Sequence, residues 1–185
     1  MGKESAGILL YRRRASGLEV LLVHPGGPFW AKKDAGAWSI PKGEHDPGED
    51  PLTAARREFT EETGFTAAGP FHPLTPLKQK SGKLVRAFAC EGEADPGALQ
   101  SNTFTLEWPP RSGNLQEFPE VDRAAWFALA EGQEKIHPGQ AGFLEELARF
   151  LGEGGAHGLE VRASGVADPC PLPQTPSPKP LKQER

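Results

Sequence analysis

The sequence predicts an α/β protein in which one β-sheet is covered by helices on both faces. Two observations predict this class: a pair of apolar strand-like segments near the N-terminus, and two amphipathic helical segments, at 51–63 and 140–151, separated by further strand-like segments. Hydrophobic residues make up 37% of the 185 residues, which suffices for a packed core. We expect residues 1–152 to form this single domain.

The first strands are predicted by short apolar runs between turn residues. Ser5–Arg13 and Leu18–His24 flank a three-residue turn and read as an antiparallel pair. Residues 25–36 are rich in glycine, proline and aromatic residues and predict a loop. Ala37–Ile40 is expected to form a short strand that ends at Pro41.

The segment Pro51–Thr63 is the clearest helix in the sequence. Pro51 suits the first helical turn, where its missing N–H costs no hydrogen bond. Gly64 suits the position just after the last turn, where the backbone takes a positive φ. Both ends of this helix are therefore predicted from single residues.

The remaining elements follow from periodicity. Phe71–Gln79 and Lys83–Glu91 predict a hairpin, Arg123–Phe127 a late strand, and Gln140–Leu151 a closing amphipathic helix. Glu153–Arg185 contains six prolines and no aromatic residue. Such a composition buries too little apolar surface to offset the entropy of ordering, so we expect a disordered, Pro-rich tail.

Charge and cysteine content exclude several classes of function. The chain holds 21 Lys and Arg against 25 Asp and Glu, a net charge of −4, which disfavours general nucleic-acid or anionic-membrane binding. The longest apolar runs are far too short to span a bilayer. Two cysteines cannot build a disulfide framework or a cysteine metal site. We expect a soluble, cytoplasmic protein with no nucleic-acid partner and no membrane contact.

The acidity is concentrated in one short segment. Between Gly43 and Phe65 seven acidic residues face two arginines, a net −5, so the rest of the chain carries +1. Glu58, Glu61 and Glu62 fall within an arc of about 100° on the predicted helix. Like charges at this spacing repel one another and oppose the negative end of the helix dipole. A divalent cation with oxygen ligands would compensate them; a solvated acidic helix face is the alternative.

The same window resembles the signature of the Nudix family. Gly43 is followed after five residues by Glu49, and after seven more by the segment Arg57–Phe65. The family pattern is G-x5-E-x7-R-E-U-x-E-E-x-G-U, where U is a bulky apolar residue. Every fixed polar and glycine position is matched, and phenylalanines stand at both U positions, where aliphatic residues are commoner. The motif covers 23 of the 185 residues.

The resemblance implies a Nudix-type α/β/α sandwich with a mixed β-sheet, in which the motif forms a loop–helix–loop. It implies binding of Mg²⁺ or Mn²⁺ by the side chains of three glutamates and a backbone carbonyl: Glu58, Glu61, Glu62 and Gly43. It also implies a structural salt bridge between Glu49 and Arg57, and a positive φ at Gly64 that lets the chain leave the helix.

Nudix enzymes mostly hydrolyse a nucleoside diphosphate linked to another group. We therefore expect Mg-dependent hydrolysis of a pyrophosphate bond in a small-molecule nucleotide. Glu61 is one expected catalytic base. Family members often use an acidic residue outside the motif as the base, and Glu120, just before the predicted strand at 123–127, is the expected residue for that role or for an extra ligand; an exposed loop acid is the alternative.

The residues before the motif favour one substrate class. A W-x-x-P-K-G lead-in, from Trp38 to Gly43, resembles dinucleoside polyphosphate hydrolases. Lys42, Lys78, Lys80 and Lys83 are the expected phosphate-binding residues, with solvated lysines as the alternative. The leading substrate is thus a diadenosine polyphosphate. A nucleoside triphosphate or modified nucleotide is the alternative substrate, and a non-catalytic nucleotide sensor the alternative function.

Aromatic residues in predicted loops are candidate platforms for a nucleobase, although each alone is more often a packing residue. They are Phe29, Trp30, Phe104 and Trp108. The five histidines show no metal-ligand spacing, and we interpret them as ordinary loop or strand-end residues.

Overall fold

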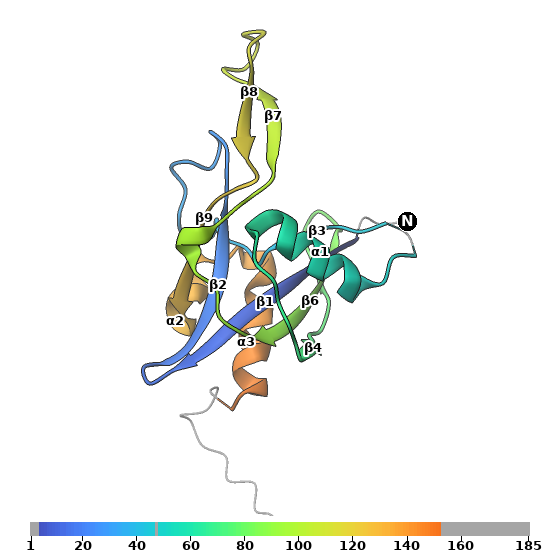
Figure 1. Ribbon diagram of the computed structural model, residues 1–185, viewed down its shortest axis with the longest axis vertical. Helices are drawn as coiled ribbons and strands as arrows, with labels where there is room; N and C mark the ends of the chain where they lie inside the picture. Colours follow the sequence, from blue (N-terminus) through green and yellow to red (C-terminus); the bar gives the residue numbers. More distant parts are fainter. Residues whose placement is uncertain (1–3, 47, 153–185) are drawn as a thin grey trace, which may run out of the picture. The chain divides into compact units, whose positions relative to one another are not determined.

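The sheet is built around its first strand, β1 (Glu4–Arg14). In the computed structural model, which describes residues 4–46 and 48–152, β1 pairs antiparallel with β2 (Gly17–Pro25) and parallel with β6 (Leu84–Glu91). The main strand order is β4-β6-β1-β2-β9, with β4 at Phe71–Pro73 and β9 at Val121–Ala128. The sheet is therefore mixed, which confirms the predicted fold class (Figure 1).

Two short strands complete the sheet. β3 (Lys42–Glu44) pairs with β1, and β5 (Leu77–Lys78) pairs with β6. The predicted strand at 71–79 is split into β4 and β5, because prolines at 73 and 76 lack the N–H that a continuous strand would donate. The prediction of a strand at 37–40 is wrong: Trp38 and Ser39 form isolated bridges to different partners, and strand pairing begins only after Pro41.

The helix α1 (Pro51–Thr63) has the predicted bounds. The Asp50 side chain caps its first turn by accepting the Thr53 N–H. Gly64 ends the helix with a φ of 74°, and its N–H donates to the carbonyl of Thr60. These contacts fix where the helix that carries the three glutamates begins and ends.

Helices cover both faces of the sheet because side chains of β1 alternate. Ile8 packs on one face with Phe59 of α1, and both are fully buried. Leu9 packs on the other face with Phe143 of α3 (Ala141–Phe150). The sheet thus lies between α1 and α3, the α/β/α arrangement that the sequence predicts.

Other elements of the structure were not predicted from the sequence. β7 (Thr103–Glu107) and β8 (Leu115–Pro119) form a separate two-stranded sheet, so the expected loop position of Phe104 is wrong. A short helix, α2 (Leu129–Lys135), follows β9. Short 3-10 turns lie at Pro96–Ala98 and Pro138–Gln140.

Figure 1 shows the β7–β8 hairpin extending beyond the end of the main sheet, next to the loop that follows β2. Among the described residues, no helix has the length and apolar content that crossing a bilayer requires. The predicted tail at 153–185 lies outside the described residues.

Candidate active site

The acidic residues of α1 lie at the edge of its buried face. Ala55 and Phe59 are fully buried against the sheet and set the orientation of the helix. The side chains of Glu58 and Glu61 are 14% and 43% exposed, so they stand at the boundary between protein and solvent. Glu62 is half-buried beside them. The helix therefore presents three carboxylates to one edge of the sheet.

Arg57 connects the motif loop to the helix. Its Nη1 donates to Glu58 at 2.6 Å and to Glu61 at 3.2 Å. Its Nε and Nη2 each donate to Glu49 at 3.3 Å, which is the salt bridge that the family resemblance implies. These acceptors hold the pKa of Arg57 above its ordinary value, first through Glu49 and then through Glu58. Arg57 thus positions two of the three carboxylates.

Strand β3 is joined to the helix at Glu62. The backbone N–H of Lys42 donates to Glu62 Oε2 at 2.7 Å. Burial raises the pKa of Glu62 to about 7, against the opposing effect of Lys42. Burial also lowers the pKa of the Lys42 amine. Both side chains are half-buried, and burial disfavours the charged form of each.

Gly43 lies against the carboxylate of Glu58. A β-carbon at this position would stand 1.8 Å from Glu58 Oε2 and 2.1 Å from its Cδ. Such separations are far inside van der Waals contact, so any larger residue would displace Glu58. The glycine of the motif therefore makes room for an acidic side chain.

Glu120 lies far from α1 in the sequence but close to the carboxylates of α1 in the structure. The Glu61 carbonyl accepts the Asn102 N–H at 3.1 Å, and the Asn102 carbonyl accepts the Glu120 N–H at 2.8 Å. The Glu120 carbonyl in turn accepts the Gly26 N–H at 2.9 Å. Partial burial, followed by the charges of Glu58 and Glu61, raises the pKa of Glu120. The structure thus brings Glu120 beside the helix carboxylates.

The donor set suits a hard divalent cation, because it consists of carboxylate and carbonyl oxygens. Burial and then the charges of Glu58 and Glu61 raise the pKa of Glu120, so these carboxylates lie close enough to repel one another. Within residues 4–46 and 48–152, no three acidic, histidine or cysteine side chains converge closely enough to enclose an ion. Instead, the Arg57 guanidinium lies between Glu58 and Glu61.

The predicted phosphate-binding lysines are only partly gathered. Lys83 pairs with Glu44 at 3.1 Å, and its charge contributes to the lowered pKa of Lys42, so these two lysines are neighbours. Lys78 in β5 and Lys80 in the following turn are exposed to solvent. Lys83 therefore lies beside β3, at Glu44, whereas phosphate binding by the four lysines stays a prediction.

His24 is a structural residue whose role the sequence did not indicate. It is fully buried at the end of β2, with Nδ1 2.8 Å from Asp122 Oδ1 and Nε2 2.7 Å from the Lys33 carbonyl. Each ring nitrogen thus faces an oxygen atom, one of a carboxylate and one of a backbone carbonyl. The ring holds the loop after β2 next to the start of β9, beside Glu120. A strand-end histidine far from Asp122 in sequence offers no local signal of this contact.

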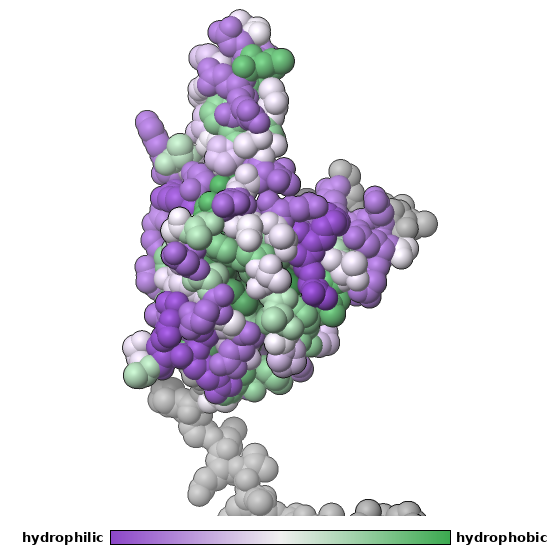
Figure 2. All heavy atoms as spheres, viewed as in Figure 1, coloured by the Kyte–Doolittle hydropathy of each residue, from purple (hydrophilic) through white to green (hydrophobic). Residues whose placement is uncertain are grey.

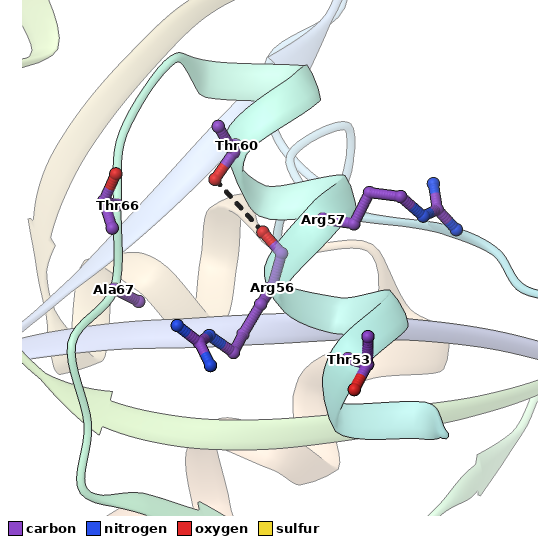
Figure 3. A pocket seen from close by; sticks show the side chains of 6 residues that line it. All are labelled: Thr53, Arg56, Arg57, Thr60, Thr66 and Ala67. Atoms are coloured by element: carbon purple, nitrogen blue, oxygen red, sulfur yellow. Dashed lines mark hydrogen bonds between the residues drawn. The ribbon is translucent and has the colours of Figure 1, made fainter. Parts of the chain in front are cut away.

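Two surface depressions lie elsewhere. One, of about 260 Å³, lies on the outer side of α1 (Figure 3) and is lined by Thr53, Arg56, Arg57, Thr60, Thr66 and Ala67. In Figure 3 the Arg56 side chain extends toward Ala67, while Arg57 points to the opposite side of the helix. The other, of about 510 Å³, lies between the start of α1 and the strands β4 and β6. Neither is lined by a residue of the acidic cluster, by which we mean Glu58, Glu61, Glu62 and Glu120.

Comparison with known proteins supports the family resemblance that the motif indicates. A family model described as "NUDIX domain" matches residues 1–147. An RNA pyrophosphohydrolase of Caulobacter vibrioides is 45% identical over 149 residues, covering 72% of this chain and 83% of the relative. An asymmetrical bis(5′-nucleosyl)-tetraphosphatase of Caenorhabditis elegans is 40% identical over 63 residues, covering 34% of this chain and 41% of the relative.

Solved structures share the fold. The crystal structure of a C. elegans Ap4A hydrolase binary complex matches with a TM-score of 0.58 and 23% identity, over 80% of this chain and 98% of that chain. The NUDIX domain of Shewanella oneidensis NrtR, complexed with ADP ribose, also matches at 0.58 with 17% identity, over 82% of this chain and 89% of that one. The complete motif and the family match over most of the chain lead to one conclusion: the chain belongs to the Nudix family and is a hydrolase that acts on pyrophosphate bonds.

Proposed function

We propose that the protein catalyses Mg²⁺-dependent hydrolysis of a phosphoanhydride bond in a nucleoside 5′-polyphosphate. One observation carries the proposal. The backbone of Glu120, which lies far from α1 in the sequence, is hydrogen-bonded through Asn102 to the helix that bears Glu58, Glu61 and Glu62. A phosphoanhydride needs its negative charge neutralised and an attacking water deprotonated. The cluster holds enough carboxylates for both tasks.

The residues divide between holding the ion and handling the proton. Glu58, Glu61, Glu62 and the Gly43 carbonyl would hold Mg²⁺ or Mn²⁺. The bound ion would neutralise phosphate charge and lower the pKa of a water. Glu120 accepts the proton of the attacking water, because its raised pKa makes it a stronger base than an ordinary carboxylate. Glu61 is the alternative base, and Arg57 keeps Glu58 and Glu61 in place.

The leading substrate is a diadenosine polyphosphate. The W-x-x-P-K-G lead-in and the similarity to the C. elegans tetraphosphatase support it, as does the net charge of −4, which is unfavourable for a long RNA. Lys42, Lys78, Lys80 and Lys83 would bind the distal phosphates. The Caulobacter RNA pyrophosphohydrolase favours a second candidate, the 5′-triphosphate end of RNA, because that similarity covers much more of the chain.

A substrate panel with Mg²⁺ tests the proposal. Diadenosine tetraphosphate, a 5′-triphosphorylated RNA, ATP and ADP-ribose are incubated with the protein, and the products are separated by chromatography. Release of ATP with AMP, or of ADP, supports the leading substrate; release of pyrophosphate from RNA supports the second. Tight binding without turnover of any compound would instead indicate a nucleotide sensor and overturn the proposal.

Two variants assign the proton transfer. Glu120→Gln keeps the shape of the side chain and removes the base, so kcat should fall about 100-fold. Glu131→Gln, an exposed acid on α2, is the matched control and should leave kcat unchanged. Full activity of Glu120→Gln together with loss of activity in Glu61→Gln would transfer the role of base to Glu61.

A further inference from the structure

A group of aromatic side chains lies along the β7–β8 hairpin and the loop beside it. It consists of Phe29, in the loop after β2, and three residues of the β7–β8 hairpin: Phe104, Trp108 and Phe118. We call this group the hairpin aromatics. Phe29 and Trp108 meet edge to face with ring centroids 5.3 Å apart, and Phe104 and Phe118 lie 6.1 Å apart across the two strands.

The hairpin aromatics are not part of the core. Phe29 is 57% exposed, and the three hairpin residues are half-buried, although each is a large apolar side chain. None of them belongs to either of the two hydrophobic clusters that fill the described sheet and helices. Figure 2 shows hydrophobic side chains along the hairpin among hydrophilic ones. Aromatic surface is thus left accessible on an element that stands away from the main sheet.

Backbone contacts place one end of this surface, with Phe104 and Phe118, beside the carboxylates of α1, while Trp108 follows the far end of β7. β7 begins one residue after Asn102, and β8 ends one residue before Glu120. The Asn102 N–H donates to the Glu61 carbonyl, and the Glu120 N–H donates to Asn102. The start of β7 and the end of β8 therefore both lie beside the proposed cleavage site.

The loop that bears Phe29 is attached at the same place. The Gly26 N–H donates to Glu120, and a β-carbon on Gly26 would stand 2.0 Å from the Pro119 carbonyl, so the two segments touch backbone to backbone. A β-carbon on Gly27 would lie 3.0 Å from the Phe104 ring. Loop and hairpin thus form one continuous surface that leads outward from Glu120.

We propose that the hairpin aromatics form the binding surface for the nucleobase of the substrate, with the exposed ring of Phe29 and the ring of Trp108 as its principal contacts. The inference rests on the proposed function. A nucleoside polyphosphate carries a flat aromatic base a few bonds from the phosphates, and such a base stacks on aromatic side chains. In this arrangement, the carboxylates act on the phosphates while the hairpin selects compounds that carry a base.

Kinetics with and without a base test the inference. Phe29→Ala is the main variant because Phe29 is the most exposed of the four and contributes least to packing. Its KM for diadenosine tetraphosphate should rise about tenfold with kcat little changed, whereas KM for inorganic tetraphosphate, which has no base, should not change. Leu115→Ala, at the start of β8 and 74% exposed, is the matched control and should change neither value.

A 5′-triphosphorylated RNA is assayed beside the dinucleotide, and the substrate whose KM rises in Phe29→Ala identifies the source of the base. An equal rise in KM for the base-free substrate, or no rise for any substrate, overturns the inference. The aromatic residues would then only hold the hairpin together.

A binding measurement separates this inference from the proposed function. Adenosine diphosphate stacked on Trp108 should quench its fluorescence, and Trp108→Phe should abolish that quenching while Phe29→Ala weakens binding. If the unmodified protein hydrolyses none of the polyphosphates, the proposed function fails, and this titration still tests the surface. Quenching that persists in Trp108→Phe places the nucleotide elsewhere and overturns the inference.

Discussion

Replacing Gly43 with alanine tests whether the position of one carboxylate controls activity. The added β-carbon would stand 1.8 Å from Glu58 Oε2. Restoring ordinary contact at 3.4 Å requires the carboxylate to retreat by roughly 1.6 Å. A displacement of this size at a catalytic group costs about 100-fold in rate. We therefore expect kcat of Gly43→Ala to fall about 100-fold.

Stability should change much less than activity in this variant. Glu58 is the end of a flexible side chain, so it can move to another rotamer at a cost of about 0.5–1.5 kcal/mol. Urea unfolding measures this cost. Gly142→Ala is the control: it adds the same methyl group within α3, where only the Leu77 side chain lies near, at 3.3 Å. Turnover of Gly43→Ala equal to that of Gly142→Ala would refute the role of Glu58.

Three further predictions concern the metal, the core and the buried histidine. Glu61→Gln should reduce Mg²⁺-dependent turnover about 100-fold or more, with unchanged circular dichroism; undiminished turnover would reject it as a ligand or base. Phe59→Ala removes a fully buried ring and should lower the free energy of unfolding by about 3–5 kcal/mol in urea titrations; a loss below 1 kcal/mol would contradict its role in orienting α1. His24→Ala leaves Asp122 and the Lys33 carbonyl without their buried partner and should cost about 1–3 kcal/mol, whereas an unchanged unfolding midpoint would mean that the contact contributes nothing.

The parts of the fold that were predictable are those where local signals agree. Helix α1 has its predicted bounds because Pro51 and Gly64 mark its ends independently of the rest of the chain. The salt bridge between Glu49 and Arg57 is implied by the resemblance to the Nudix signature, and the structure contains it.

The β7–β8 hairpin was missed because its strands are short and are joined by a segment containing two prolines and a glycine, which predicts a loop. Contacts between distant segments were equally out of reach. The proximity of Glu120 to Glu61 depends on hydrogen bonds made by the backbone of Asn102. Because every residue except proline offers the same backbone groups, no side-chain pattern predicts such a link.

The attachment of the hairpin has a consequence for how the enzyme can diversify. The chain leaves the body at Asn102 and returns at Glu120, and the two are themselves hydrogen-bonded. The intervening residues can therefore be lengthened, shortened or exchanged with those of a relative while the junction stays closed. Recognition of new compounds could then evolve, or be engineered, by exchange of the hairpin while the acidic residues of α1 and Glu120 stay unchanged.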